Sequence, residues 1–211
     1  NAECAMAIGW NANATAENAI ALGYTANALA ANSTAIGTSA AATGNRSMAF
    51  GASATASEKN TVAIGTAAKA TGINSTAIGL DASVSGKNSV ALGRKAITDG
   101  TNSTAIGSLA KAKGNQSVAI GRGARSDQFG STALGARANA LGARSIAIGA
   151  YANATQECSI AIGLGAESTA ENSIAIGDSA KTFAANATAV GTLAVANQSN
   201  SSAYGTDAAA T

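Results

Sequence analysis

The 211-residue chain contains no proline and no histidine, and only 3% of its residues are aromatic and 11% charged. Typical globular domains carry about 25% charged residues and build their cores from leucine, valine and aromatic side chains. Without histidine, the chain lacks the side chain that most often serves as a general base or as a transition-metal ligand. No nucleophile–base pair and no paired carboxylates recur at any spacing in the sequence. We therefore expect no enzyme, no cofactor and no metal site.

Long apolar runs are also missing, although 46% of the residues are hydrophobic. Since no stretch of about 18 apolar residues occurs, we expect no direct membrane insertion of this segment. No basic segment followed by an apolar run opens the chain, so we expect no signal peptide. Disorder is a poor interpretation because the net charge is only +2 and the mean hydropathy is slightly positive. Alanine supplies much of the apolar content, which points to a repetitive structure.

One tripeptide, alanine–apolar–glycine, recurs every 14 residues without insertion or deletion, from Ala7-Ile8-Gly9 to Ala203-Tyr204-Gly205. Fifteen such repeats account for 210 of the 211 residues, which predicts a single domain spanning residues 1–211 without a linker. With this glycine as position 0, positions −2 and +3 are alanine in all fifteen repeats. Charged residues occur only at positions +1, +2, +4 and +6 and from −7 to −5. This segregation predicts that the charged positions face the solvent and that the alanine positions face the interior.

The columns of the repeat predict a stack of narrow coils. Positions −4 to 0 alternate with period two, which predicts a strand with two different faces, and positions +3 to +5 predict a second, shorter strand. Each strand would pair in parallel with its counterpart in the next coil, about 4.8 Å away. So narrow a coil needs alanine and glycine inside, which would explain positions −2, 0 and +3. The large side chains at −3 and −1 would then point outward.

The outward residues at positions −3 and −1 would form an unbroken apolar stripe along the stacked coils. Soluble monomers rarely expose contiguous apolar patches of more than a few hundred Å², so we expect further copies of the chain to bury this stripe. The repeat itself does not set the number of copies. The predicted oligomer core consists of Ile8, Leu22, Ile36, Phe50, Ile64, Ile78, Leu92, Ile106, Ile120, Leu134, Ile148, Ile162, Ile176 and Val190.

The segments Asn88-Ser89-Val90-Ala91-Leu92-Gly93 and Asn172-Ser173-Ile174-Ala175-Ile176-Gly177 resemble the head repeat of YadA-type trimeric autotransporter adhesins. The resemblance extends over the whole chain. It implies an all-β, left-handed parallel β-roll solenoid of fifteen 14-residue coils, assembled as a homotrimer. It also implies display on a bacterial surface, with the stalk and outer-membrane anchor expected to lie outside this sequence. The implied partners are extracellular matrix proteins such as collagen, host cells or abiotic surfaces.

Positive charge is concentrated between residues 94 and 144, where eight cations face two acids, whereas residues 145–211 carry five acids and one lysine. Such a basic belt either attracts an anionic partner or is a solvated face that keeps the protein soluble. Apart from Phe129, the belt lacks the aromatic platforms of single-strand nucleic-acid binders, so we expect no nucleic-acid partner. The possible ligand-binding belt consists of Arg94, Lys95, Lys111, Lys113, Arg122, Arg125, Arg137 and Arg144.

Smaller features each allow two interpretations. Asparagine occupies position −5 in nine repeats and forms either a recognition row or turns with left-handed backbone. Its replacement in the other six repeats puts the turn hydrogen bonds there in doubt. Trp10 and Tyr24, at position +1 of adjacent coils, form either a binding hot spot or protection of the sheet edge. Cys4 and Cys158 lie eleven coils apart, too far for a disulfide within one chain.

Two functions remain open from the sequence. The first is an adhesin head that attaches through many weak contacts, repeated along the coils and across the subunits. The alternative is a structural spacer that presents another binding domain. The irregular outward columns weaken a strictly periodic binding code but do not separate these two functions.

Overall fold

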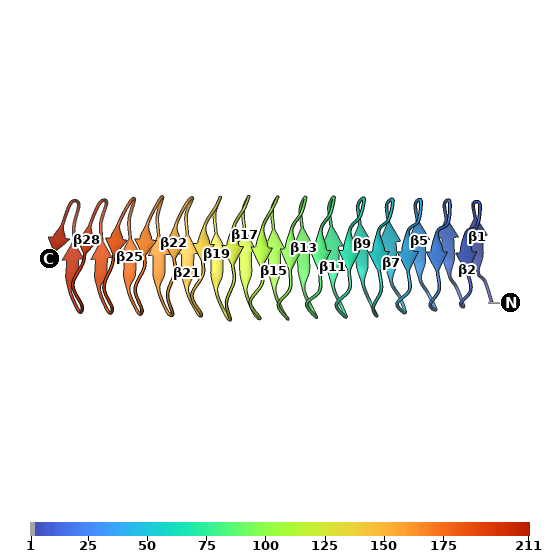
Figure 1. Cartoon of the computed structure of the whole chain (residues 1–211), viewed down its shortest axis with the longest axis horizontal. Coiled ribbons are helices and arrows are strands. Elements are labelled where there is room, and N and C mark those ends of the chain that lie inside the picture. The colour runs from blue at the N-terminus through green and yellow to red at the C-terminus, as the bar shows by residue number, and fades with distance from the viewer. Residues whose placement is uncertain (1–2) are drawn as a thin grey trace. The chain divides into compact units, whose positions relative to one another are not determined.

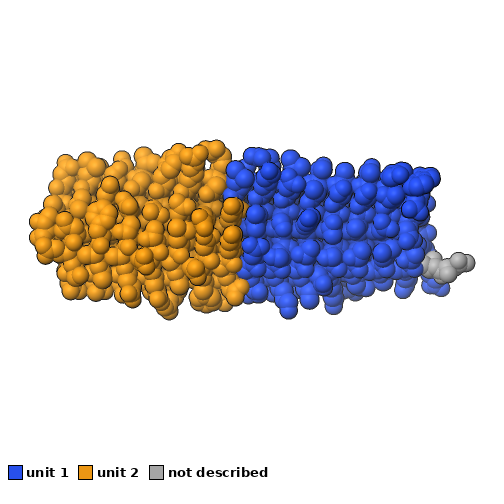
Figure 2. Space-filling model, in the orientation of Figure 1, with its two compact units in different colours: residues 1–109 blue, residues 110–211 orange. Residues whose placement is uncertain are grey.

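The computed structural model describes residues 3–211, and its regular secondary structure is entirely β. Contacts gather in two compact units, residues 1–109 and residues 110–211 (Figure 2). In each unit, three-residue and two-residue strands alternate along the chain and successive coils lie side by side (Figure 1). We call the sheet of three-residue strands sheet A and the sheet of two-residue strands sheet B. Among the described residues, none belongs to a helix that could cross a membrane.

Unit 1 contains the first half of these strands. Its sheet A consists of β1 (Met6–Ile8), β3 (Ile20–Leu22), β5 (Thr34–Ile36), β7 (Met48–Phe50), β9 (Val62–Ile64), β11 (Thr76–Ile78), β13 (Val90–Leu92) and β15 (Thr104–Ile106). Its sheet B consists of β2 (Asn13–Ala14), β4 (Asn27–Ala28), β6 (Ala41–Ala42), β8 (Thr55–Ala56), β10 (Lys69–Ala70), β12 (Ser83–Val84) and β14 (Ile97–Thr98).

Unit 2 repeats the same arrangement. Its sheet A consists of β17 (Val118–Ile120), β19 (Thr132–Leu134), β21 (Ile146–Ile148), β23 (Ile160–Ile162), β25 (Ile174–Ile176), β27 (Thr188–Val190) and β29 (Ser202–Tyr204). Its sheet B consists of β16 (Lys111–Ala112), β18 (Arg125–Ser126), β20 (Asn139–Ala140), β22 (Asn153–Ala154), β24 (Glu167–Ser168), β26 (Lys181–Thr182), β28 (Val195–Ala196) and β30 (Ala209–Ala210).

Pairing within both units is parallel and offset by one repeat. In unit 1, β1 pairs with β3 so that Ala7 lies beside Ala21, and in unit 2, β19 pairs with β21 so that Ala133 lies beside Ala147. The predicted parallel β-solenoid is therefore confirmed. The strands are shorter than expected, covering positions −3 to −1 and +4 to +5, because the chain turns at the flanking positions.

The interior is built from alanine and small hydroxyl side chains. In β19, Ala133 is 0% exposed while its neighbours Thr132 and Leu134 face outward, as the period of two predicts. Alanine at position +3, such as Ala138, is buried as well. Among the fully buried side chains of the described residues, Val84 is the largest. The coil is therefore too narrow for leucine or an aromatic ring inside.

The glycine at position 0 has a different role from the one predicted. We expected it inside the coil, but it lies in the turn after each strand of sheet A, with φ between 116° and 139°. A Cβ atom on Gly135 would lie 2.5 Å from the carbonyl oxygen of Gly149 in the next coil. Both the backbone conformation and the close stacking of turns thus require glycine.

Buried serine and threonine side chains form hydrogen bonds within and between coils, which alanine cannot do. The Ser126 Oγ lies 2.6 Å from the Ser131 Oγ, within one coil. Between neighbouring coils, the Thr182 Oγ1 donates a hydrogen bond of 3.2 Å to the Ser168 Oγ. In unit 1, the Ser103 backbone N–H donates to the Ser89 Oγ at 3.1 Å. These bonds satisfy polar groups that would otherwise be costly to bury.

Candidate binding surfaces

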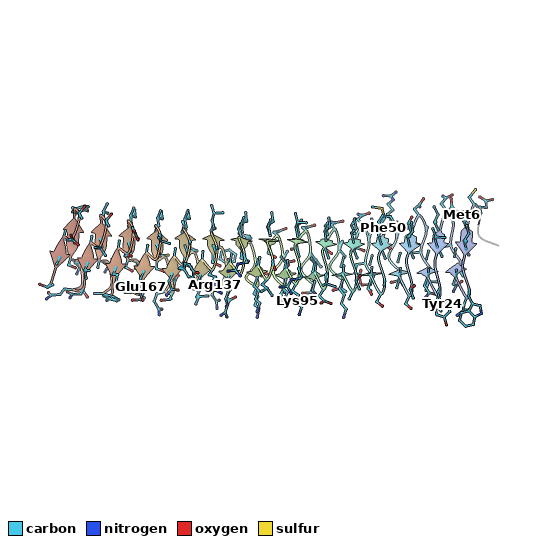
Figure 3. The ribbon with its side chains drawn as sticks, turned by 90° about the horizontal axis from the view of Figure 1, so that it is seen from above. Met6, Tyr24, Phe50, Lys95, Arg137 and Glu167 are labelled. Atoms are coloured by element: carbon cyan, nitrogen blue, oxygen red, sulfur yellow. The ribbon has the colours of Figure 1, made fainter. Side chains whose placement is uncertain are left out.

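Each unit presents two outward faces of different chemistry. Sheet A exposes positions −3 and −1, whereas sheet B exposes position +4, flanked by +2 and +6. In unit 1, Met6 and Phe50 project on one side, while Tyr24 and Lys95 project on the other (Figure 3). The first face is apolar and the second is polar and variable in sequence, so the two faces suit different partners.

The outer face of sheet A carries all fourteen residues of the predicted oligomer core. Each of them is the last residue of a three-residue strand, and within one chain they are half-buried or exposed. Leu92 is 42% exposed and Leu134 is 43% exposed. Neighbouring strands hold these side chains in register, as with Ile148 and Ile162. Each unit therefore displays a continuous apolar row.

The residues named above as the oligomer core all lie at position −1, and position −3 faces outward on the same side of sheet A, as expected. Met6 and Met48 are 44% and 39% exposed there, and Ile146, Ile160 and Ile174 are half-buried. Side chains two residues apart in a strand share a face. The outer face is thus two side chains wide. It is continuously apolar at position −1, whereas threonine interrupts position −3 in β5, β11, β15, β19 and β27.

The structure divides the predicted basic belt among several surfaces. Arg94 and Lys95 lie in a turn of unit 1 at positions +1 and +2. Arg122 occupies position +1 in unit 2, and Arg144 lies in the other turn of its coil, at position −5. On the sheet B side of unit 2, at positions +2, +4 and +6, the belt residues are Lys111, Lys113, Arg125 and Arg137. The belt is therefore several basic patches.

Two belt residues are already paired with carboxylates. Arg125 forms an ion pair with Asp127, and Arg144 forms one with Glu157. The hydrogen bond to Glu157, together with the nearby Cys158, raises the pKa of Arg144, so this exposed guanidinium stays charged. In contrast, Lys111, Lys113, Arg122 and Arg137 form no ion pair with any described carboxylate.

One further cation has an aromatic partner. The guanidinium of Arg137 lies 5.7 Å from the centre of the Tyr151 ring in the next coil. This cation–π contact orients the side chain without neutralising its charge.

The asparagine column forms turns. All residues at position −5 have φ between 53° and 64°, the left-handed region that asparagine tolerates. The Asn74 Nδ2 donates to the Asn88 Oδ1 at 2.9 Å, and Asn60 donates to Asn74 at the same distance. Arg46 and Gln116, which replace asparagine, keep φ values of 57° and 58°. The turn therefore survives where the side-chain ladder is interrupted.

Exposed aromatic side chains gather at one place in unit 1. The rings of Trp10 and Tyr24 stack at 4.9 Å between centroids with a 12° interplanar angle. They are 68% and 53% exposed.

Both cysteines are free, with Cys4 exposed and Cys158 half-buried. Within residues 3–211 there is no enclosed pocket and no cluster of metal-ligating side chains.

A family model of the YadA head domain repeat matches the chain at residues 5–26, 14–40, 42–68, 70–96, 99–124, 129–152, 154–180 and 184–208. The chain belongs to the YadA head repeat family. This membership confirms the resemblance inferred from the repeat. Among solved structures, these YadA head repeats are similar to the collagen-binding domain of the Yersinia adhesin YadA. The identity is 32%, the match covers 64% of this chain and 67% of that chain, and the TM-score is 0.46. No curated protein matches the chain.

Proposed function

We propose that this chain is the head of a homotrimeric adhesin on a bacterial surface. It attaches to matrix proteins such as collagen, to host cells or to surfaces through many weak contacts. Membership of the YadA head repeat family supports the adhesin function. The proposal includes no catalytic step, since the role of the chain is to bind and to hold.

The observation that carries the proposal is the apolar outer face of sheet A. Along this face, exposed leucines such as Leu92 and Leu134 lie among half-buried isoleucines such as Ile106 and Ile148. Leaving such a face in water costs roughly 25 cal/mol for each Å² of apolar area, so a second and a third copy stabilise it by covering it. Burying sheet A leaves sheet B and the turns facing outward in every subunit.

Three outward faces on one assembly favour attachment by avidity. Binding of one subunit raises the effective concentration of the others at the surface, so weak individual contacts add up to firm attachment. The alternative function, a spacer that presents another domain, uses the same trimer but needs no affinity of its own. The two functions therefore differ in binding and not in assembly.

The assembly is tested by light scattering of the purified chain. A particle of three times the 20.1 kDa chain mass supports the trimer. Ile162→Asp places a charge in the apolar row beside Ile148 and Ile176, so we expect a smaller mass. A folded monomer of the unaltered chain would contradict the proposal.

Attachment is tested on immobilised collagen, with fibronectin, laminin and cultured host cells as further surfaces. We expect saturable binding of the unaltered protein and at least about a hundredfold weaker binding of the dissociated Ile162→Asp variant. A trimer that binds none of these surfaces would favour the spacer. Equal binding of trimer and monomer would contradict attachment by avidity.

A further inference from the structure

Unpaired cations gather on the sheet B face of unit 2. Positions +4 and +6 share one face, since Arg125 at +4 pairs with Asp127 at +6. Position +2 is exposed in the turn that leads into the same strand, where Arg137 has a φ of 57°. Lys111 and Arg125 lie in register on the adjacent strands β16 and β18. Lys113 follows Lys111 by two residues, and Arg137 precedes Asn139, the register partner of Arg125, by two residues.

The cations at +6, +4 and +2 of successive coils form a diagonal line across this face. Backbone hydrogen bonds hold its outer members in the stack, because the Lys113 N–H donates to the Ser126 carbonyl at 2.8 Å and the Arg137 N–H donates to the Arg122 carbonyl at 2.9 Å. With strands about 4.8 Å apart and a rise of about 3.3 Å per residue, the Cα atoms of Lys113 and Arg125 are about 8 Å apart. Arg137 continues the line from the turn of the next coil, so the face presents a row of positive charges.

The charge on this face is largely uncompensated. Lys111, Lys113 and Arg137 form no ion pair, and the only described acid among them is Asp127, which Arg125 binds. The next two strands present the neutral amides Asn139 and Asn153. Farther along, Glu167 lies 3.8 Å from Lys181. The surface therefore consists of a positive patch followed by uncharged amide groups that can form hydrogen bonds.

We propose that this face, formed by Lys111, Lys113, Arg125, Arg137, Asn139 and Asn153, binds a linear sulfated polysaccharide of the host matrix. The inference deepens the proposed attachment function, on which it rests, by naming one class of ligand. Sulfate groups keep their negative charge at physiological pH and accept hydrogen bonds from guanidinium and ammonium groups. Sugar hydroxyls match the amides of Asn139 and Asn153. The face offers no pocket in the described residues, which suits an extended chain lying across the strands.

Nucleic acid fits this face less well. Single-strand binders interleave cations with free aromatic rings on which bases stack. Here the face carries one ring, Tyr151, and the guanidinium of Arg137 lies 5.7 Å from its centre. A single ring that already contacts a cation does not provide the series of stacking platforms that a nucleic-acid strand needs.

The test measures binding of the full 211-residue chain to immobilised heparin, a highly sulfated probe. The test variant is Lys111→Gln/Lys113→Gln/Arg137→Gln, which keeps the Arg125–Asp127 ion pair. The matched control is Arg46→Gln/Lys59→Gln/Lys87→Gln, which removes the same charge from exposed turns at positions −5 and −6 of unit 1. We expect the test variant to lose about tenfold in affinity and to show a weaker salt dependence, and the control to change little.

Several results would overturn the inference. They are no binding to heparin, equal losses in test variant and control, or binding of hyaluronan, single-stranded RNA or anionic vesicles as strong as that of heparin. Circular dichroism and light scattering show whether both variants keep their fold and mass. The collagen and cell assays report on the proposed function separately. If the unaltered chain fails to bind heparin but still attaches to collagen or cells, only this inference is rejected. Failure of attachment to all matrix and cell surfaces rejects the proposed function.

Discussion

Replacing Ala133 by leucine tests how narrow the coil is. Ala133 is 0% exposed and lies in register between Ala119 and Ala147, which are also fully buried. Since Val84 is the largest fully buried side chain described, leucine at this position exceeds anything that the interior accommodates. Overpacking a close-packed interior costs about 1–3 kcal/mol. At about 2–4 °C for each kcal/mol in a chain of this size, the melting temperature should fall by about 2–12 °C.

The assay is thermal unfolding followed by circular dichroism at a fixed protein concentration. Ala136→Leu is the matched control, because it makes the same chemical change three residues later at an exposed turn position. We expect it to change the free energy of unfolding by no more than about 0.5 kcal/mol. Equal shifts for the two variants, or an unchanged melting temperature for Ala133→Leu, would refute the assignment of inward and outward faces.

Substitutions at three further positions test the turns and the interior. Gly135→Ala should lower the free energy of unfolding, measured with denaturant, by about 1–3 kcal/mol, because φ is 135° and the new Cβ meets the Gly149 carbonyl. A neutral effect would contradict the close stacking of the turns. Asn74→Val should destabilise more than Asn74→Gly, since only the second change suits φ of 56°, and the reverse order would argue against a turn role. Ser126→Ala should cost about 1 kcal/mol through loss of the bonds to Ser131, and unchanged unfolding would show that these bonds contribute nothing.

Much of the fold follows from the sequence because a 14-residue period leaves few alternatives. Alternation around Ala133 predicts which side chains point inward, and exact repetition predicts parallel pairing. The role of glycine at position 0 was not predictable in the same way. Invariance indicates only that a side chain is excluded, whereas the φ of Gly135 and the proximity of Gly149 show that backbone conformation and coil stacking exclude it.

The candidate binding surfaces were less predictable. Counting charges between residues 94 and 144 identifies an excess of cations but does not show which of them are neutralised. Arg125 and Arg144 pair with Asp127 and Glu157, and the second pair joins residues of adjacent coils in a turn. The diagonal of Lys113, Arg125 and Arg137 has a spacing of 12 residues, which differs from the period of the repeat. A search for the 14-residue period therefore passes over it.

The buried hydroxyl contacts have a consequence for how the chain finds its register during folding. Alanine columns are the same in every coil, so a chain that skips one coil still stacks alanine on alanine. Contacts such as Thr182 to Ser168 are not the same in every coil. If the coil of Ser168 were looped out, Thr182 would lie against Ala154, and its buried hydroxyl would lose this partner at a cost of about 1–3 kcal/mol. Polar contacts of this kind thus distinguish one coil from another in an otherwise uniform interior, and their loss destabilises the chain when a coil is skipped.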